Sequence, residues 1–152
     1  MLKKQLQKGF TIVELLIVIV VIGILAALVL NTFSGVQRRA RDTERQTDIN
    51  SIATQLEVYY NDNSGYPILT GELASDTWAT SNLKGIDLNA LRAPGAAANS
   101  MQATATPDKD HYGYMTYDSD GTTACATSPC AKFKLYWYKE DTSAVQEKDS
   151  LN

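Results

Sequence analysis

The sequence predicts an α+β fold in which one long N-terminal helix packs on a small antiparallel sheet. Three observations support this prediction. An apolar run near the N-terminus passes into an amphipathic stretch, and no proline interrupts either of them before Pro67. Two late segments alternate apolar and polar residues, as half-buried strands do. The chain has 152 residues, which suits one domain with an attached anchor.

The first element is an apolar run over residues 10–30, FTIVELLIVIVVIGILAALVL. From Leu15 to Leu30 every residue is apolar or glycine. About 20 such residues in a helix match the ~30 Å core of a bilayer. The apolar core of an ordinary secretory signal has only about 7–15 residues, and no convincing cleavage site of small residues follows this run. We therefore expect residues 10–30 to be a transmembrane helix that remains in the mature protein.

Charge alone does not orient this helix. Three lysines precede the apolar run, and four arginines follow it closely (Lys3, Lys4, Lys8; Arg38, Arg39, Arg41, Arg45). Counting positive charges on the two sides therefore does not decide which end is cytoplasmic.

Glu14 lies inside the apolar run. An ionised carboxylate at the centre of a bilayer costs on the order of 2.5–3.5 kcal/mol, so such a residue needs a partner or access to water. One interpretation places Glu14 at the depth of the interface, where it is hydrated. The other starts from a cut between Gly9 and Phe10, which would create an ammonium one helical turn away. That ammonium could pair with Glu14 of the same or a neighbouring helix.

The segment Lys8–Leu15 and the aliphatic stretch that continues through residues 23–27 resemble the class III signal of type IV prepilins. The resemblance implies that a prepilin peptidase cuts after Gly9 and methylates the new N-terminus at Phe10. It also implies that Glu14 helps to align subunits in a filament. A pilin-like fold is then expected, with the helix as its spine.

The same resemblance implies topology and partners. Residues 1–9 form a basic leader that stays in the cytoplasm and is removed, and residues 62–152 form an extracytoplasmic domain. The chain is then a single-pass membrane protein that later joins a cell-surface filament. Its implied partners are the prepilin peptidase, the membrane, the inner-membrane assembly machinery and other pilin subunits, in a homo-oligomer. Many major pilins carry a proline where this chain has Asn31, so we expect a straighter helix and a weaker case for a major pilin.

The helix should continue over residues 31–61 and end before Gly65 and Pro67. Apolar residues at spacings of three and four predict the face that packs on the C-terminal domain (Ile49, Ile52, Ala53, Leu56, Tyr59, Tyr60). On the other side, charged neighbours predict the pairs Arg38/Asp42, Arg41/Glu44 and Arg45/Asp48, worth ~0.2–0.5 kcal/mol each. A solvated face is the favoured interpretation of this cluster, and contacts between subunits are the alternative.

In residues 62–152, the region Ile68–Asp110 reads as a variable loop with a short helix at Leu88–Arg92, capped by Asp87. Strands are predicted at Tyr112–Tyr117 and Lys132–Tyr138, and Ala144–Leu151 is a weak third candidate. Alternation places three apolar side chains of the second strand on one face, which should lie on the helix at Ile52 and Leu56 (Phe133, Leu135, Trp137).

Cys125 and Cys130 are the only cysteines. Outside the cytoplasm a disulfide between them is the natural expectation, and two free thiols are the alternative. A zinc site lacks a second pair of ligands, because His111 is the only histidine. Asp118 and Asp120 before Gly121 weakly suggest calcium, but a turn between strands is the favoured interpretation.

The sequence contains no nucleophile–base pair, phosphate-binding loop or other catalytic arrangement, so we expect neither enzymatic activity nor a cofactor. The net charge is −3 and no basic face is evident, which argues against specific binding of nucleic acid.

The expected function is a structural subunit of a type IV pilus-like filament for motility, adhesion or DNA uptake. Alternatives are a pseudopilin of a type II secretion or competence system and a monomeric membrane-anchored extracellular binding protein. Gly9-Phe10 and Glu14 argue against the last, since an anchor needs neither.

Overall fold

The computed structural model describes residues 9–152, apart from the side chains of residues 31 and 32. Most of the predicted leader, including its three lysines, lies outside the described residues. The chain divides into two compact units, Met1–Gln37 and Arg38–Asn152. Helix α1, Ile12–Asn63, contributes residues to both units, and each unit is described by itself.

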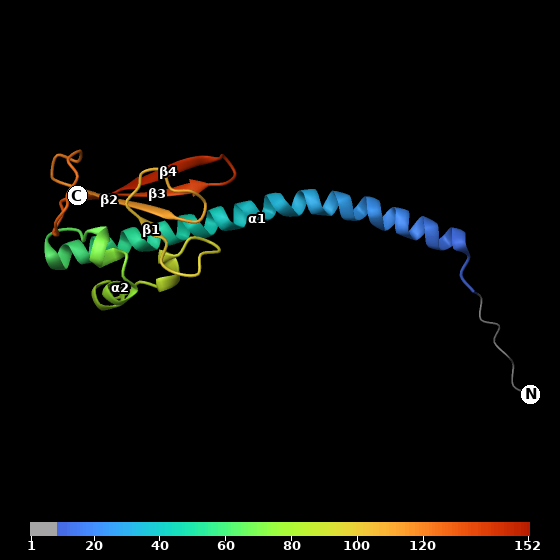
Figure 1. Cartoon of the computed structure of the whole chain (residues 1–152), viewed down its shortest axis with the longest axis horizontal. Helices are drawn as coiled ribbons and strands as arrows, with labels where there is room; N and C mark the ends of the chain where they lie inside the picture. The colour runs from blue at the N-terminus through green and yellow to red at the C-terminus, as the bar shows by residue number, and fades with distance from the viewer. Residues whose placement is uncertain (1–8) are drawn as a thin grey trace, which may run out of the picture. The chain divides into compact units, whose positions relative to one another are not determined.

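In the first unit, the described structure is the N-terminal part of α1, drawn in blue in Figure 1. Its side chains are exposed along the whole apolar run. No residue of this part packs into a core, because a single helix has no second apolar face to bury against. No packing contact within this unit therefore accounts for the hydrophobicity of the run.

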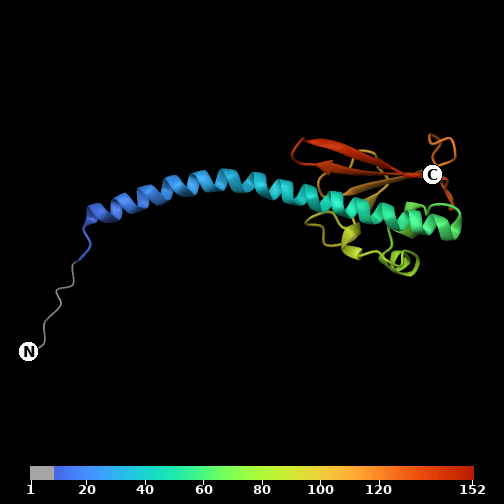
Figure 2. The ribbon, with the colours of Figure 1, turned by 180° about the vertical axis from the view of Figure 1, so that it is seen from behind.

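The second unit has its core between the C-terminal part of α1 and a sheet. Figures 1 and 2 show the sheet on one side of this part of the helix and α2 on another. Ile49, Ile52 and Leu56 of the helix are completely buried, and so is Leu135 of the facing strand. Each such side chain stabilises the fold by about 1.5–3 kcal/mol relative to exposure. The predicted helix face and the predicted strand face thus meet in one cluster of buried residues.

The sheet has four strands in the order β1-β2-β3-β4. Their bounds are Met101–Gln102, Tyr112–Tyr117, Lys132–Lys139 and Ala144–Asp149. The last three form an antiparallel meander, so the weak third candidate is a strand. β1 pairs with β2 in parallel, so the sheet is mixed, and this short parallel strand was not predicted.

The parallel pair results from the path of residues 103–111. A side chain on Gly113 would collide with the carbonyl oxygen of Thr104 and would come within 2.9 Å of Tyr136 Cβ. Because Tyr136 lies opposite Gly113 in the β2–β3 ladder, the loop crosses the face of the sheet that points away from the helix. The chain then returns to begin β2 in the same direction as β1.

Helix α1 ends at Asn63, and the next residue, Ser64, adopts the left-handed conformation (φ 59°). Gly65 has a different role. A Cβ at this position would collide with Pro129 and lie 3.0 Å from the carbonyl oxygen of Cys130. The missing side chain lets the next residue, Tyr66, pair with Cys130 through two backbone hydrogen bonds of 2.7 and 2.9 Å.

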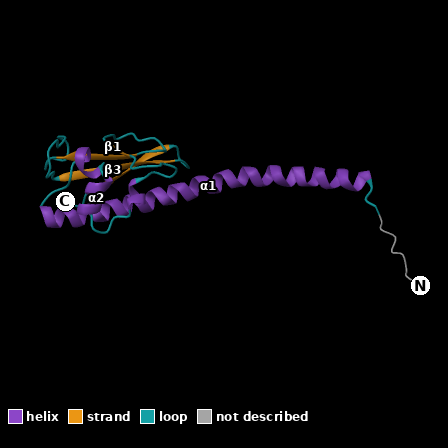
Figure 3. Ribbon diagram, turned by 60° about the horizontal axis from the view of Figure 1, so that its bottom comes forward, coloured by secondary structure: helices purple, strands orange, loops and turns teal. Residues whose placement is uncertain are grey.

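The region Ile68–Asp110 is more regular than the expected loop (Figure 3). It contains α2, Asp76–Asn82, which begins where the Ser75 hydroxyl accepts a hydrogen bond from the Trp78 amide. Such a cap compensates for the weak helix propensity of a seven-residue segment. A 3₁₀ turn follows at Leu88–Leu91, and Asp87 caps it as predicted.

The predicted solvated face of the helix is wrong for two of the arginines. Arg45 is only 1% exposed and donates to Asp42 at 3.1 Å, to Glu140 at 2.7 Å and to the Lys109 carbonyl at 2.8 Å. Arg41 donates two further hydrogen bonds to Glu140. We call Arg41, Asp42, Arg45 and Glu140 the helix–turn network, since it fastens the β3–β4 turn to α1.

Candidate functional site

The described chain begins at Gly9, and helix α1 begins at Ile12 with Thr11 as its N-cap. The Thr11 amide and hydroxyl both donate to one oxygen of Glu14, at 2.9 and 2.7 Å. In return the Glu14 amide donates to the Thr11 hydroxyl at 3.2 Å. These three bonds form a capping box, the arrangement typical of Thr-x-x-Glu at the start of a helix.

Thr11 was not among the site residues predicted from the sequence. The spacing Thr11-x-x-Glu14 is the signal that could have found it. The capping box gives Glu14 hydrogen-bond donors within its own helix start. These bonds from Thr11 stabilise the carboxylate without a neighbouring cation.

Gly9 and Phe10 make no packing contact that explains them. A side chain added at Gly9 would meet no atom within 4 Å, and Phe10 is 88% exposed. An exposed aromatic ring is unfavourable in water, at roughly 25 cal/mol per Å² of apolar surface. The described structure therefore offers no internal reason for this pair of residues.

The apolar half of α1 is long and apolar enough to cross a membrane. An 18-residue window within it has a mean hydropathy of 3.2, and none of that window is buried inside the chain. A continuous apolar surface of this length is unlike the scattered apolar residues of soluble surfaces. Lipid or other apolar helices must cover it.

The remaining candidate residues lie in the second unit, away from any clustered chemistry. Cys125 and Cys130 form a disulfide, and the Cys125 amide donates to Thr116 of β2. The Asp120 carboxylate accepts hydrogen bonds from Thr122 and Thr123, as in a turn. Within residues 9–152, no group of three or more His, Cys, Asp or Glu residues is arranged to hold a metal ion.

His111 and Asp118 also have local explanations. His111 Nδ1 lies 2.6 Å from Asp108, three residues earlier, on the surface of the domain. That hydrogen bond holds the pKa of the Asp108 carboxyl below its usual value. The Asp118 amide donates to the Thr123 carbonyl, which closes the turn that Asp120 caps.

Residues 4–30 match the family model described as the prokaryotic N-terminal methylation motif. This range contains all three residues of the candidate cleavage and assembly site, Gly9, Phe10 and Glu14. The match begins within the predicted leader and ends where the apolar run ends.

Relatives of two kinds are similar to this chain. Type II secretion system core protein G of Dickeya chrysanthemi is 41% identical over 61 residues, which cover 40% of each protein. The protein of the same description from Pseudomonas aeruginosa is 39% identical over 66 residues. These matches span less than half the length of the secretion relatives.

The type IV major fimbrial protein FimA of Dichelobacter nodosus is 27% identical over 148 residues, covering 86% of this chain and 95% of FimA. No solved structure gives a significant match to the chain. The methylation motif, the relatives of both kinds and the long apolar helix beside a small sheet all support a place for the chain in the type IV pilin and pseudopilin family.

Proposed function

We propose that this chain is a structural, non-enzymatic subunit of a type IV pilus-like filament. The observation that carries the proposal is the fully exposed apolar half of α1, which starts directly after Gly9, Phe10 and the Thr11–Glu14 capping box. A helix that has no partner in its own chain is suited to a core made of many copies. In such a core, packing against other copies keeps the apolar surface out of water.

In this proposal the leader, residues 1–9, lies in the cytoplasm, and the second unit lies outside it. A prepilin peptidase cuts after Gly9 and methylates Phe10. Glycine at position 9 is then required by the peptidase that recognises this segment, since a side chain there would meet no other atom of the fold. Membrane-bound machinery extracts the subunit, and exchange of lipid for neighbouring helices keeps the apolar surface out of water.

Glu14 supplies the register between subunits. A carboxylate surrounded by apolar helices is costly unless a cation or donor meets it. Thr11 meets it in the uncut chain, and the ammonium formed at Phe10 of the same or a neighbouring subunit meets it after processing. Where the pair joins neighbouring subunits, a shift of one subunit along the filament would remove it, so the charge fixes the register of the helices.

A pseudopilin of a type II secretion or competence system is the second candidate. It is favoured by the stronger identity to the secretion proteins, although that identity lies within less than half of the chain. The fimbrial relative aligns with 86% of the chain and with 95% of its own length. We place the pilus subunit first for that reason.

The first test is the intact mass and N-terminal sequence of the protein in filaments sheared from cells. The proposal predicts a chain that starts at Phe10 and carries one additional methyl group. A chain that still starts at residue 1 and occurs only in membranes would instead support a monomeric anchor. Filaments seen on cells only when the gene is overexpressed would favour the pseudopilin.

A second test separates assembly from insertion. The variant Glu14→Ala should enter the membrane as well as the unchanged protein does but should yield few filaments. A matched control is Glu44→Ala, because Glu44 is an exposed acid of the same helix outside the apolar run. Normal filament yield from Glu14→Ala would show that the charge does not align subunits.

A further inference from the structure

Strand β4 is the outer strand of the sheet, and among residues 9–152 no strand pairs with its second edge. The Ser150 amide donates to the Phe133 carbonyl of β3. Since backbone groups alternate along an antiparallel strand, Ala144, Gln146 and Lys148 also point toward β3. The N–H and C=O groups of Val145, Glu147 and Asp149 therefore point away from the sheet. Such an edge is a template for an added strand.

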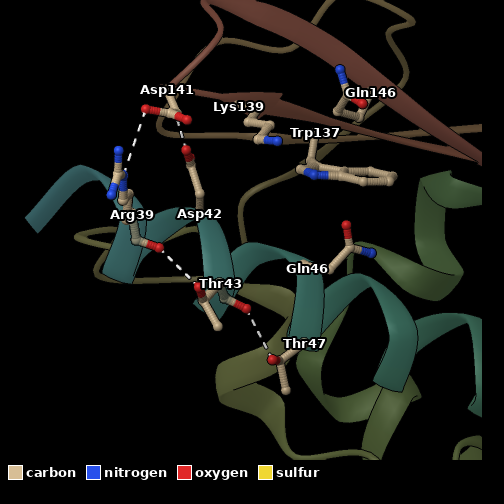
Figure 4. A pocket seen from close by; sticks show the side chains of 9 residues that line it. All are labelled: Arg39, Asp42, Thr43, Gln46, Thr47, Trp137, Lys139, Asp141 and Gln146. Carbon is tan, nitrogen blue, oxygen red and sulfur yellow. Dashed lines mark hydrogen bonds and ion pairs between the residues drawn. The ribbon is translucent and has the colours of Figure 1, made fainter. Parts of the chain in front are cut away.

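A polar groove of about 450 Å³ lies between this strand and helix α1. Figure 4 shows the Trp137 indole between Gln146 of β4 and Gln46 of α1. Within the described part of the chain, the indole N–H, the Gln46 amide and the Lys139 ammonium have no hydrogen-bond partner. The groove thus presents donors that a ligand with acceptor oxygens would satisfy.

Two cations, Arg39 and Lys139, and two acids, Asp42 and Asp141, line the end of the groove nearest the β3–β4 turn. Arg39 lies 3.9 Å from Asp141 in a largely exposed pair, and Lys139 is unpaired within the described residues. Asp42 lines the same end, but the Glu140 and Asp141 amides and Arg45 already occupy its oxygens. A carboxylate beside Lys139 would therefore meet a cation with no competing acid of its own.

We propose that the free edge of β4 and this groove together bind an extended, acidic peptide segment of a partner protein. The segment adds to β4 as a fifth strand, with its backbone paired to Val145, Glu147 and Asp149. Side chains on one face of it reach into the groove, and a carboxylate there contacts Lys139. Strand addition of this kind takes affinity from the backbone and specificity from alternate side chains.

The binding site does not depend on the filament proposal, since all its residues belong to the second unit. Failure of one proposal therefore leaves the other intact. The test uses the full chain in detergent micelles, carrying Trp78→Phe so that Trp137 is the only tryptophan. The probe is the synthetic peptide acetyl-(Thr-Glu)₃-Thr-amide.

Two readouts are expected to change together. Saturating peptide should shift the Trp137 fluorescence, and it should slow exchange of the Val145, Glu147 and Asp149 amides by about tenfold or more. The Gln146 and Lys148 amides already pair with β3, so their exchange should not change. A peptide with proline at alternate positions keeps the carboxylates but lacks backbone donors, and it should give neither effect.

Charge is tested with matched lysines. Lys139→Met should weaken peptide binding roughly fivefold. Lys132→Met changes a lysine of the same strand outside the groove and should leave binding unchanged, and a peptide with lysine in place of glutamate should not bind. Equal weakening by both variants would remove the role assigned to Lys139.

Three results would overturn the proposal. One is the absence of any change at millimolar peptide. The second is a fluorescence change without the alternating protection, which would mean that a ligand enters the groove without strand addition. The third is protection of the Val145 and Glu147 amides in the peptide-free protein that disappears on dilution, because the occupant would then be a second copy of this chain.

Discussion

Gly113 shows how one missing side chain determines the path of a loop. The Thr104 carbonyl occupies the space where a Cβ would stand, and Tyr136 lies beside it. Both neighbours are held in place, Thr104 by its own amide hydrogen bond to Gln102 and Tyr136 by the β3 ladder. A methyl group therefore has to displace backbone.

We predict that Gly113→Ala destabilises the second unit by about 1–3 kcal/mol, the usual cost of overpacking. Urea unfolding followed by tyrosine and tryptophan fluorescence measures the change. The control is Gly35→Ala, where an added methyl meets nothing within 4 Å and the helix should gain stability. Equal behaviour of the two variants would contradict the close approach of Thr104.

The Thr11–Glu14 capping box leads to a second prediction for a single residue. Thr11→Val keeps the shape of the side chain but removes the hydroxyl that bonds both the Glu14 carboxylate and the Glu14 amide. Loss of such a cap costs ~0.5–2 kcal/mol. Amide exchange in the first turn of α1 should accelerate roughly fivefold in micelles, whereas Thr11→Ser should behave as the unchanged chain does. Unaltered exchange in the valine variant would mean that the hydroxyl does not hold the helix start.

At the scale of elements, the long helix and the strands β2 and β3 were predictable because their patterns are local and strongly periodic. The parallel strand β1 was not, because two residues carry no periodicity and the strand exists only through its pairing with β2. The motif residues around Gly9 could be predicted from the sequence although they show no periodicity. Their order along the chain carries the signal, and no tertiary contact is needed to recognise it.

The helix–turn network was missed for a physical reason. Reading charges at spacings of three and four finds only partners on the same helix. Arg45 donates to Asp42 on its own helix, but its second carboxylate partner is Glu140, 95 residues later. Burial of Arg45 makes this pair more consequential than an exposed one, because a buried charge without its partner is costly.

Accordingly, Glu140→Ala should destabilise the second unit by about 3 kcal/mol, since Arg41 loses its carboxylate and the buried Arg45 loses one of its three acceptors. The matched control is Asp141→Ala, which removes only an exposed pair at 3.9 Å and should cost less than about 1 kcal/mol. Chemical denaturation at neutral pH compares the two. A control as damaging as Glu140→Ala would show that the turn, and not the network, determines stability.

Two acids of this part of the fold respond to pH in opposite directions. Hydrogen bonds from Arg41, reinforced by Arg45, lower the pKa of Glu140 to about 2 from 4.5. Its stabilising effect is therefore full above pH 4.5 and is lost as the pH falls toward 2. Burial raises the pKa of Asp48 to about 6 from 3.8, against the effect of its hydrogen bond from Tyr112.

For Asp48 the folded state holds its proton more tightly, so stability falls as the pH rises from 3.8 to about 6. We predict that Asp48→Asn abolishes this fall and still accepts the Tyr112 hydrogen bond. The urea midpoint of the variant should be higher than that of the unchanged protein at pH 7. The midpoints at pH 4 and pH 7 should therefore differ less in the variant. A variant less stable than the unchanged protein at pH 7 would contradict the burial of Asp48 as the cause.

At the scale of the whole molecule, the two units differ in what holds them together. Every buried apolar residue of the core cluster lies between Ile49 and Trp137, inside the second unit. The first unit contributes none of them. Helix α1 is thus continuous in its hydrogen bonds, but only its C-terminal part packs in the core, and its apolar part stays exposed.

This division predicts that a fragment of residues 34–152 folds without detergent. It keeps the whole core, the helix–turn network and the disulfide, and Ser34 offers a natural helix cap. The NMR signals of its β2, β3 and β4 amides should match those of the full chain in micelles. Its thermal unfolding midpoint should lie within a few degrees of the midpoint of the full chain. The fragment should also fail to enter filaments when it is expressed beside the full chain, because it lacks the apolar helix and Glu14. An unfolded fragment would show that the apolar half of α1 stabilises the domain directly, and incorporation into filaments would show that contacts of the second unit suffice for assembly.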